Sequence, residues 1–425
     1  MKSLASKSLN SLRSWRATLG VKATLTVGLA IGGSIIARLI YPVIQILLAR
    51  LMGFSQYGLY IALFALLSPV ASAASLGLEP WLLRQSGKPG LAGSIGDVLA
   101  VRLGALSLLV LVAAPLLALT HRDSYSLAIV SVAGVALVSE TLVATADAAL
   151  RAQARVVAAA LLQVGIAAVF FGLVWFAWRP GASMGRALAY RTGASLIGLG
   201  SAWWLLRAVR PAAWAPRRWW AMLKQTKVYY ASEILATISL KADLTMIALL
   251  AGSAAVALYG PGLTIINTTF LVPGIASQII LPLISRQRFG SPKYWITLQL
   301  GVVCSVAYGL LVAAALFWAA PLVVSILYGP EYSGTVPLLQ IMCLIPLLKS
   351  LNFCWATIMV AHDQQPLRTK LQAVGALFNP LANLAWIPLF GVMGAAWVNL
   401  ATEFILVLCY GYGAWVTVRR EQHTA

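Results

Sequence analysis

The charged residues that lie inside long apolar runs are the side chains of this sequence best placed to do chemistry. A charge is costly in hydrocarbon unless it faces a partner or a polar cavity. The basic members are candidates to bind an anionic substrate: Arg38, Arg191, Lys241 and Lys349. The acidic members are candidates to bind a coupling ion or to pair with a base: Glu140, Asp147, Glu233 and Asp243.

A simpler interpretation exists for some of these residues. Glu140, Asp147 and Arg191 lie close enough to the end of a run for their side chains to extend into water. Arg38 and Lys241 lie well inside their runs, so this interpretation does not account for them.

Two stretches that align without gaps indicate an internal repeat. ILLARLMGFSQYGLY (46–60) matches TMIALLAGSAAVALY (245–259), and each stretch closes one long apolar run and opens the next. Lys241 then matches Pro42, which lies one helical turn from Arg38. Residues four apart share a helix face, so the repeat predicts two cations on equivalent faces at similar depth.

Two cations that meet in a central cavity need an anion. A pyrophosphate group would satisfy Arg38 and Lys241, which is the substrate-binding interpretation. The structural alternative is that the acidic side chains of Asp243 and Glu233 pair with them, and the sequence leaves both open.

No constellation typical of an enzyme or a metal site is present in the sequence. There is no P-loop, so we expect no nucleotide hydrolysis, and we expect no catalytic residue, metal or cofactor. The histidines lack a partner at catalytic or ligating spacing, and the cysteines form no CxxC pair. These residues are His121, His362, His423, Cys304, Cys343, Cys354 and Cys409.

The composition is that of a membrane protein. Of the residues, 60% are hydrophobic and 10% charged, against about 25% charged in a soluble domain. Apolar runs of about 20 residues or more recur along the chain, and they are too long for the strands of a barrel. The net charge of +20 sits in short clusters between these runs, which indicates cytoplasmic loops rather than a nucleic-acid surface.

The elements that position the charged residues are therefore membrane-spanning helices. We predict an all-α polytopic membrane protein with about twelve of them. The expected spans are 22–50, 57–79, 93–119, 125–149, 155–178, 184–208, 227–251, 255–283, 295–319, 334–361, 369–389 and 392–417.

Basic residues alternate between loops, which predicts cytoplasmic termini at both ends. The expected organisation is a cytoplasmic tail (1–20), an N-lobe (21–208), a basic cytoplasmic linker (209–226), a C-lobe (227–418) and a cytoplasmic tail (419–425). Six spans per repeat give both lobes the same orientation, so a pseudo-twofold axis along the membrane normal should relate them.

Several ordered patches resemble the polysaccharide transporter proteins, the O-antigen (Wzx-like) flippases of the MOP superfamily. The patches are spread over nearly the whole chain. They are ILLARLMGFSQYGLYIALFALLSPVASAASLGLEPWLLRQ (46–85), ADLTMIALLAGSAAVALYGPGLTI (242–265) with LPLISR (281–286), ILYGPEYSGTVPLLQIM (326–342) and GVMGAAWVNLATE (391–403).

The resemblance implies two six-helix lobes of the MATE-like type around a central cavity. It implies movement of an undecaprenyl-diphosphate-linked oligosaccharide across the bacterial inner membrane by alternating access, for O-antigen, capsule or exopolysaccharide synthesis. Membrane lipids, a polysaccharide polymerase and a chain-length regulator are the expected partners, and no nucleic acid is expected. Arg50 and Asp243 match charged positions often seen in the family. Whether H+, Na+ or the membrane potential drives the cycle stays open.

Two other functions are consistent with a polytopic chain. A MATE-like cation-coupled drug or metabolite antiporter would need buried acidic residues in the N-terminal half, for which Glu140 and Asp147 are candidates. A membrane glycan polymerase or ligase would need a large periplasmic loop with catalytic charges. The short loops expected on that side argue against the enzyme.

Overall fold

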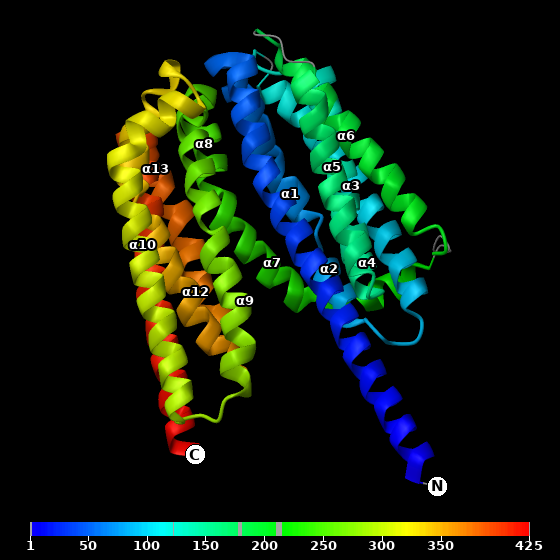
Figure 1. Ribbon diagram of the computed structural model, residues 1–425. Helices are drawn as coiled ribbons and strands as arrows, with labels where there is room; N and C mark the ends of the chain where they lie inside the picture. Colours follow the sequence, from blue (N-terminus) through cyan, green and yellow to red (C-terminus); the bar gives the residue numbers. More distant parts are fainter. Residues whose placement is uncertain (1, 122, 177–180, 210–214, 425) are drawn as a thin grey trace.

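The computed structural model describes residues 2–121, 123–176, 181–209 and 215–424, and this part of the chain is helical apart from short connections (Figure 1). Its helices are α1 Lys2–Ala73, α2 Leu78–Arg84, α3 Leu91–Thr120, α4 Leu127–Ala152, α5 Val156–Phe176, α6 Met184–Leu205, α7 Pro216–Leu250, α8 Gly252–Thr269, α9 Leu271–Arg286, α10 Pro292–Leu327, η1 Pro330–Tyr332, α11 Thr335–Met342, α12 Ile345–Ala361 and α13 Gln365–Thr424. The all-α prediction is confirmed.

The first and last helices each fold back on themselves at a glycine. Gly53 has φ 71° and ψ 173°, outside the helical region, and it divides α1 into a first limb (2–52) and a second limb (54–73). Residues twelve apart in a straight helix are about 18 Å apart. The Tyr57 hydroxyl nevertheless donates to Oε1 of Gln45 at 3.5 Å, so the two limbs form a hairpin. This is the interruption predicted between 50 and 57.

Gly391 does the same in α13, with φ 58° and ψ −143°. Asn379 Nδ2 donates to the Thr402 hydroxyl at 3.3 Å across the elbow. The limbs of α13 are therefore residues 365–390 and 392–424. A positive φ suits glycine because a Cβ would crowd the backbone there.

Two predicted spans are broken where the sequence analysis expects one helix. Span 255–283 is divided into α8 and α9, and span 334–361 into α11 and α12. In both, the first helix ends four residues before a proline, Pro273 or Pro346, which has no N–H to bond that carbonyl. The Tyr308 hydroxyl donates instead to the carbonyl of Thr269, at 2.6 Å.

Eight helical segments of the described residues are long and apolar enough to cross a membrane. Two of them, Gly32–Ala73 and Gln365–Gln422, contain the elbows at Gly53 and Gly391. The chain is thus a multi-pass membrane protein. The count of twelve spans in two six-helix lobes stays a prediction.

The N-terminal tail and the linker, both expected as loops, are partly helical. Helix α1 is already helical at Lys2, within the expected tail, and α7 begins at Pro216, within the expected linker. Residues 210–214 of that linker lie outside the described residues. A proline in the first turn is well placed to start a helix, because its missing N–H has no helical partner there.

Helices α1 to α6 gather on one side of the molecule and α8 to α13 on the other, with α7 passing between them (Figure 1). Both chain ends lie at the same end of the molecule, and the two groups of ribbons diverge toward it (Figure 1). A core shared by the two groups packs Leu48 of α1, Tyr259 of α8 and Leu338 of α11, all fully buried.

Close helix packing makes a stability prediction at Gly309 of α10. A Cβ there would overlap Cα of Leu347 in α12, which is backbone and cannot rotate away. Gly309→Ala should therefore cost about 1–3 kcal/mol of stability through overpacking. Thermal unfolding in detergent measures this. Gly104→Ala in α3, where a Cβ meets nothing within 4 Å, is the matched control, and equal melting temperatures for the two variants would contradict the prediction.

Candidate functional site

The best-defined charged contact in the N-terminal half joins Arg191 of α6 to Glu140 of α4. Arg191 Nε lies 2.6 Å from Glu140 Oε1, and Nη2 lies 2.9 Å from Oε2. This bidentate geometry is the strong form of an ion pair. The side chains are 20% and 33% exposed, so the pair is partly screened from solvent.

Aromatic side chains of the second limb of α1 cover the same guanidinium. Arg191 Nη1 donates to the Tyr60 hydroxyl at 3.2 Å, and its Cζ lies 3.5 Å from the centre of the Phe64 ring. Arg191 is thus already neutralised and held in place. Its predicted role as a free cation for substrate stays a prediction, and a role in shaping the site fits its contacts better.

Arg38 has the opposite character, because it is exposed and forms no ion pair among the described residues. It lines a cavity of about 530 Å³ between the first limb of α1 and helices α8 and α9. Polar side chains share this lining, notably Gln45, Asn267 and Gln278. An anion with hydroxyl-rich substituents would find a charge and amide groups there.

A second cavity, of about 580 Å³, also contains Arg38 and extends along α5. Arg151 and Gln163 line it together with Gln278. Arg151 pairs with Asp147 one turn earlier, Nε to Oδ2 at 2.7 Å. In the sequence Arg151 stands out only as one of the loop-side basic residues, since it lies at a helix end where such residues are common.

Lys241 of α7 is exposed toward a different cavity, of about 320 Å³. Ser68 and Pro69 of the second limb of α1 form the other wall, and Lys241 is the one charged residue in this lining. Lys241 lies within electrostatic range of Arg191 and Glu140, and no ion pair with it occurs in the described part of the chain. Arg38 and Lys241 therefore line separate cavities.

The two cavities lie at equivalent places in the repeat. Arg38, on the first expected span, faces α8 and α9, which form the eighth. Lys241, on the seventh expected span, faces the second limb of α1, which is the second. The sequence repeat placed the two cations on equivalent faces, and the fold turns those faces to two interfaces instead of one.

Asp243 is buried in a network of neutral hydrogen-bond donors. The Tyr259 hydroxyl donates to Oδ2 at 3.0 Å, and Asn383 Nδ2 donates to Oδ1 at 3.1 Å. Asn379 and Asn399 extend the network by accepting from Asn383 and donating to Tyr259. No basic side chain pairs with Asp243 among the residues described, so the interpretation that it neutralises Arg38 or Lys241 finds no contact to support it.

Glu233 of α7 also lies away from both cations. Its Oε2 is buried without a hydrogen-bond partner within the described ranges. Its charged neighbours are Arg102 and Glu79, which form their own pair at 3.3 Å. Glu233 therefore belongs to a separate cluster between α7, α2 and α3.

Lys349 of α12 is neutralised within the C-terminal half. Its Nζ lies 2.6 Å from Glu403 Oε1 of α13, and Asn352 Nδ2 donates to the other oxygen at 2.8 Å. Glu403 is only 5% exposed. The interpretation of Lys349 as a substrate-binding cation remains untested, but its charge already has a partner.

A contact between the two helix groups that the sequence analysis missed lies at Arg50. The guanidinium donates to the carbonyls of Leu327, at 2.8 Å, and Ile326 at the end of α10. The last carbonyls of a helix lack intrahelical donors and lie at its negative end. The signal in the sequence was an arginine just before a glycine elbow.

Tyr332 of η1 reinforces this contact. Burial, with a smaller contribution from Glu331, raises the pKa of the Tyr332 phenol, so it stays protonated and donates to the carbonyl of Ala49 at 3.3 Å. Its ring packs against Phe54 and Tyr57. Together these contacts hold the α1 elbow to the end of α10, at the end of the molecule away from the chain termini (Figure 1).

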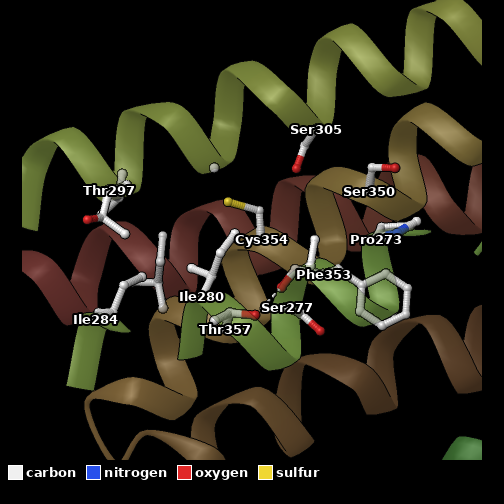
Figure 2. A pocket seen from close by; sticks show the side chains of 14 residues that line it. Pro273, Ser277, Ile280, Ile284, Thr297, Ser305, Ser350, Phe353, Cys354 and Thr357 are labelled. Atoms are coloured by element: carbon white, nitrogen blue, oxygen red, sulfur yellow. Dashed lines mark hydrogen bonds between the residues drawn. The ribbon is translucent and has the colours of Figure 1, made fainter. Parts of the chain in front are cut away.

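A small pocket between α9, α10 and α12 has several hydroxyl groups and one thiol in an otherwise apolar lining (Figure 2). Ser277, Thr297, Ser305 and Thr357 line it with Cys354. No charged residue is part of this lining, so the pocket offers no ionic contact to an anionic substrate.

Comparison with known proteins places this geometry in a family. Residues 47–337 match the family described as polysaccharide biosynthesis protein, which is more than half of the chain. The chain belongs to that family. The resemblance drawn from the sequence patches is thereby confirmed.

Solved structures of the MOP superfamily share the fold. Lipid II flippase MurJ in an inward closed conformation superposes with a TM-score of 0.71 at 12% identity, covering 91% of this chain and 87% of that one. An inward-facing MATE multidrug resistance transporter gives 0.63 at 13%, covering 92% and 96%. A MOP superfamily transporter from Pyrococcus furiosus gives 0.56 at 14%, covering 93% and 94%. These proteins are a flippase and transporters, which agrees with the expectation that the chain is not an enzyme.

One curated relative matches over a short part of its length. An uncharacterized membrane protein of Methanocaldococcus jannaschii is 30% identical over 84 residues. These residues are 20% of this chain and 17% of that protein.

The pair formed by Arg191 and Glu140 makes a testable prediction. Glu140→Gln leaves a partly buried guanidinium unpaired. Breaking an exposed ion pair costs about 1 kcal/mol of stability and breaking a fully buried one about 3–5 kcal/mol, so the loss of stability here should fall between these values. The double variant Glu140→Gln with Arg191→Met should regain part of that stability, measured as melting temperature in detergent. Asp147→Asn, which breaks a pair between residues one turn apart within α4 and joins no second helix, is the control. Additive effects of Glu140→Gln and Arg191→Met would contradict the coupling.

Proposed function

We propose that this protein is a flippase that moves an undecaprenyl-diphosphate-linked oligosaccharide across the inner membrane by alternating access. The observation that carries the proposal is Arg38. It is an arginine without an ion pair in the described structure, deep in an apolar helix yet lining a polar cavity between the two helix groups. Membership in the polysaccharide biosynthesis protein family and the MurJ-like fold support it.

The diphosphate is the part of the substrate that Arg38 would recognise. A guanidinium binds phosphate oxygens through paired N–H donors, so it suits this group better than a neutral drug. The amides of Gln45, Asn267 and Gln278 share its cavities and would accept and donate to sugar hydroxyls. Lys241 would hold the diphosphate at the repeat-related interface, between α7 and the second limb of α1. The polyprenyl chain would stay in the bilayer.

The proposed direction of transport follows from the loops. Basic residues concentrate in alternate loops and at both termini, so we place these on the cytoplasmic side of the inner membrane. The divergence of the helix groups toward the termini (Figure 1) then faces the side where lipid-linked repeats are made. A polysaccharide polymerase and a chain-length regulator are the partners that such a pathway requires.

The Asp243 network is our candidate for cation coupling by H+ or Na+. A buried carboxylate without a basic partner needs a proton or a cation to neutralise it. The adjacent Oδ1 of Asn383 is buried and accepts no hydrogen bond from the described residues. It would supply a second oxygen ligand for a bound cation. The membrane potential alone is the alternative driving force.

The antiporter alternative has less support from the acidic residues that it needs. Glu140 is bound by Arg191 and Asp147 by Arg151. Neither of these two candidate carboxylates is therefore left for a coupling ion, although MATE transporters share the fold.

The cationic cavities predict a specific loss of export. Arg38→Gln and Lys241→Gln should each lower export of surface polysaccharide on the order of 10-fold to 100-fold. This is the change that corresponds to the free energy of one charge-assisted hydrogen bond to the substrate. A deletion strain complemented with each variant provides the measurement, with inner-leaflet lipid-linked oligosaccharide quantified beside surface glycan. Lys88→Gln, in an exposed loop, is the control. Full export by both variants would overturn the assigned roles, and normal glycan with new drug sensitivity in the deletion strain would overturn the flippase itself.

The coupling proposal predicts that Asp243→Asn uncouples transport. Flipping in proteoliposomes should lose its dependence on an imposed proton or sodium gradient, because the amide carries no charge to neutralise. Asp363→Asn is the matched control, since Asp363 is an exposed loop carboxylate with φ 57°, a conformation that asparagine also adopts. Retained gradient dependence in Asp243→Asn would rule this site out.

A further inference from the structure

The outer face of the N-terminal helix group carries a groove that the proposed transport path does not use. It lies between α5 and α6 and has a volume of about 710 Å³. Ala158 and Val169 mark its extent along α5, and its lining contains no charged residue. Gly165 and Gly200 line it, and a Cβ at either would meet nothing within 4 Å, so both positions face open space.

The length of the groove corresponds to one leaflet of a bilayer. Ala158 and Val169 are eleven residues apart, which is about 16 Å along a helix at about 1.5 Å per residue. The hydrocarbon core of a bilayer is about 30 Å thick, so one leaflet supplies about half of that. The groove therefore matches an acyl chain that enters from one membrane surface.

Two arginines stand at one mouth of this groove. Arg155 precedes α5, and its Nη1 donates to the carbonyl of Leu205 at the end of α6, at 2.7 Å. Arg207 follows α6, and its Cζ lies 5.3 Å from the centre of the Trp204 ring. Both arginines and Trp204 are exposed, and Trp204 and Leu205 line the groove directly.

The groove, the Trp204 indole and the two arginines follow one another in the same order as the acyl chain, interface region and phosphate of a phospholipid. The apolar groove takes an acyl chain, the indole occupies the interface, and the two guanidinium groups face the level of the phosphate. Two positive charges favour a headgroup with a net negative charge over a zwitterionic one. The opposite face of α5 packs closely on α1, where a Cβ at Gly33 would lie 3.1 Å from that of Ala160. A lipid here would support the helix group that carries Arg38.

We propose that the α5–α6 groove is a binding site for an anionic phospholipid, with its phosphate on Arg155 and Arg207 and an acyl chain between Gly165 and Gly200. The site is independent of the transport cavities and of the substrate that they carry.

Native mass spectrometry of the full chain, delipidated and then titrated with an equimolar mixture of phosphatidylglycerol and phosphatidylethanolamine, tests the proposal. Two arginines at the surface should give phosphatidylglycerol a preference of about thirtyfold. Arg155→Gln with Arg207→Gln should abolish the preference while leaving weak binding of both lipids. Equal binding of both lipids to the wild type would overturn the proposal.

Groove-filling variants separate this site from lipid bound elsewhere. Gly165→Leu and Gly200→Leu should each reduce phosphatidylglycerol binding, because a Cβ at either position has open space around it and the longer side chain would occupy the acyl path. Gly172→Leu, at an equally open position of α5 outside the groove lining, should bind as the wild type does. A photoreactive phosphatidylglycerol should label peptides of α5 and α6 in the wild type. Labelling only of peptides outside α5 and α6 would overturn the assignment. Displacement of phosphatidylglycerol by an equal concentration of polyprenyl phosphate would overturn it too.

Discussion

The cost of holding a charge in hydrocarbon controls the arrangement of this molecule. Most charges inside its helices have found partners that offset this cost: Arg191 with Glu140, Lys349 with Glu403, and Arg102 with Glu79. Each pair joins two helices, so each also fixes how those helices lie against one another. Arg38 and Lys241 differ because they have cavities instead of carboxylates. Under this constraint an unpaired cation needs water or an anionic ligand.

Local defects interrupt the helices, and one of them lies beside the cavity that Arg38 faces. Prolines 273 and 346 break two spans four residues upstream, and glycines 53 and 391 turn two long helices into hairpins. A backbone group freed in the membrane must be satisfied again, as the Tyr308 hydroxyl does for Thr269. The cavity around Arg38 lies beside this break, and Phe270 and Leu271 line it.

The proposed alternating access requires contacts that can be exchanged, and the contacts between and within the two helix groups differ in this respect. At the end away from the termini, Arg50 and Tyr332 tie the α1 elbow to α10 through backbone carbonyls. Such contacts do not leave a buried charge on the partner when they part, so they suit a closure that opens and reforms. The buried pair of Lys349 and Glu403 lies inside one helix group and would be much more costly to separate.

The sequence by itself determined the helical membrane class, the family and the interruptions near Gly53 and Gly391, and it placed Arg38 and Lys241 well inside apolar runs. These follow from composition, from residues adjacent in the chain and from a repeat that can be read without coordinates. Which charge met which was decided only by the tertiary structure, because Arg191 lies 51 residues from Glu140 and Lys349 lies 54 from Glu403. Spacing along a helix gives the face of a residue but not the helix that packs on that face. The repeat in the sequence therefore put Arg38 and Lys241 on equivalent helix faces. Only the fold shows that these faces contact different helices and form two separate interfaces.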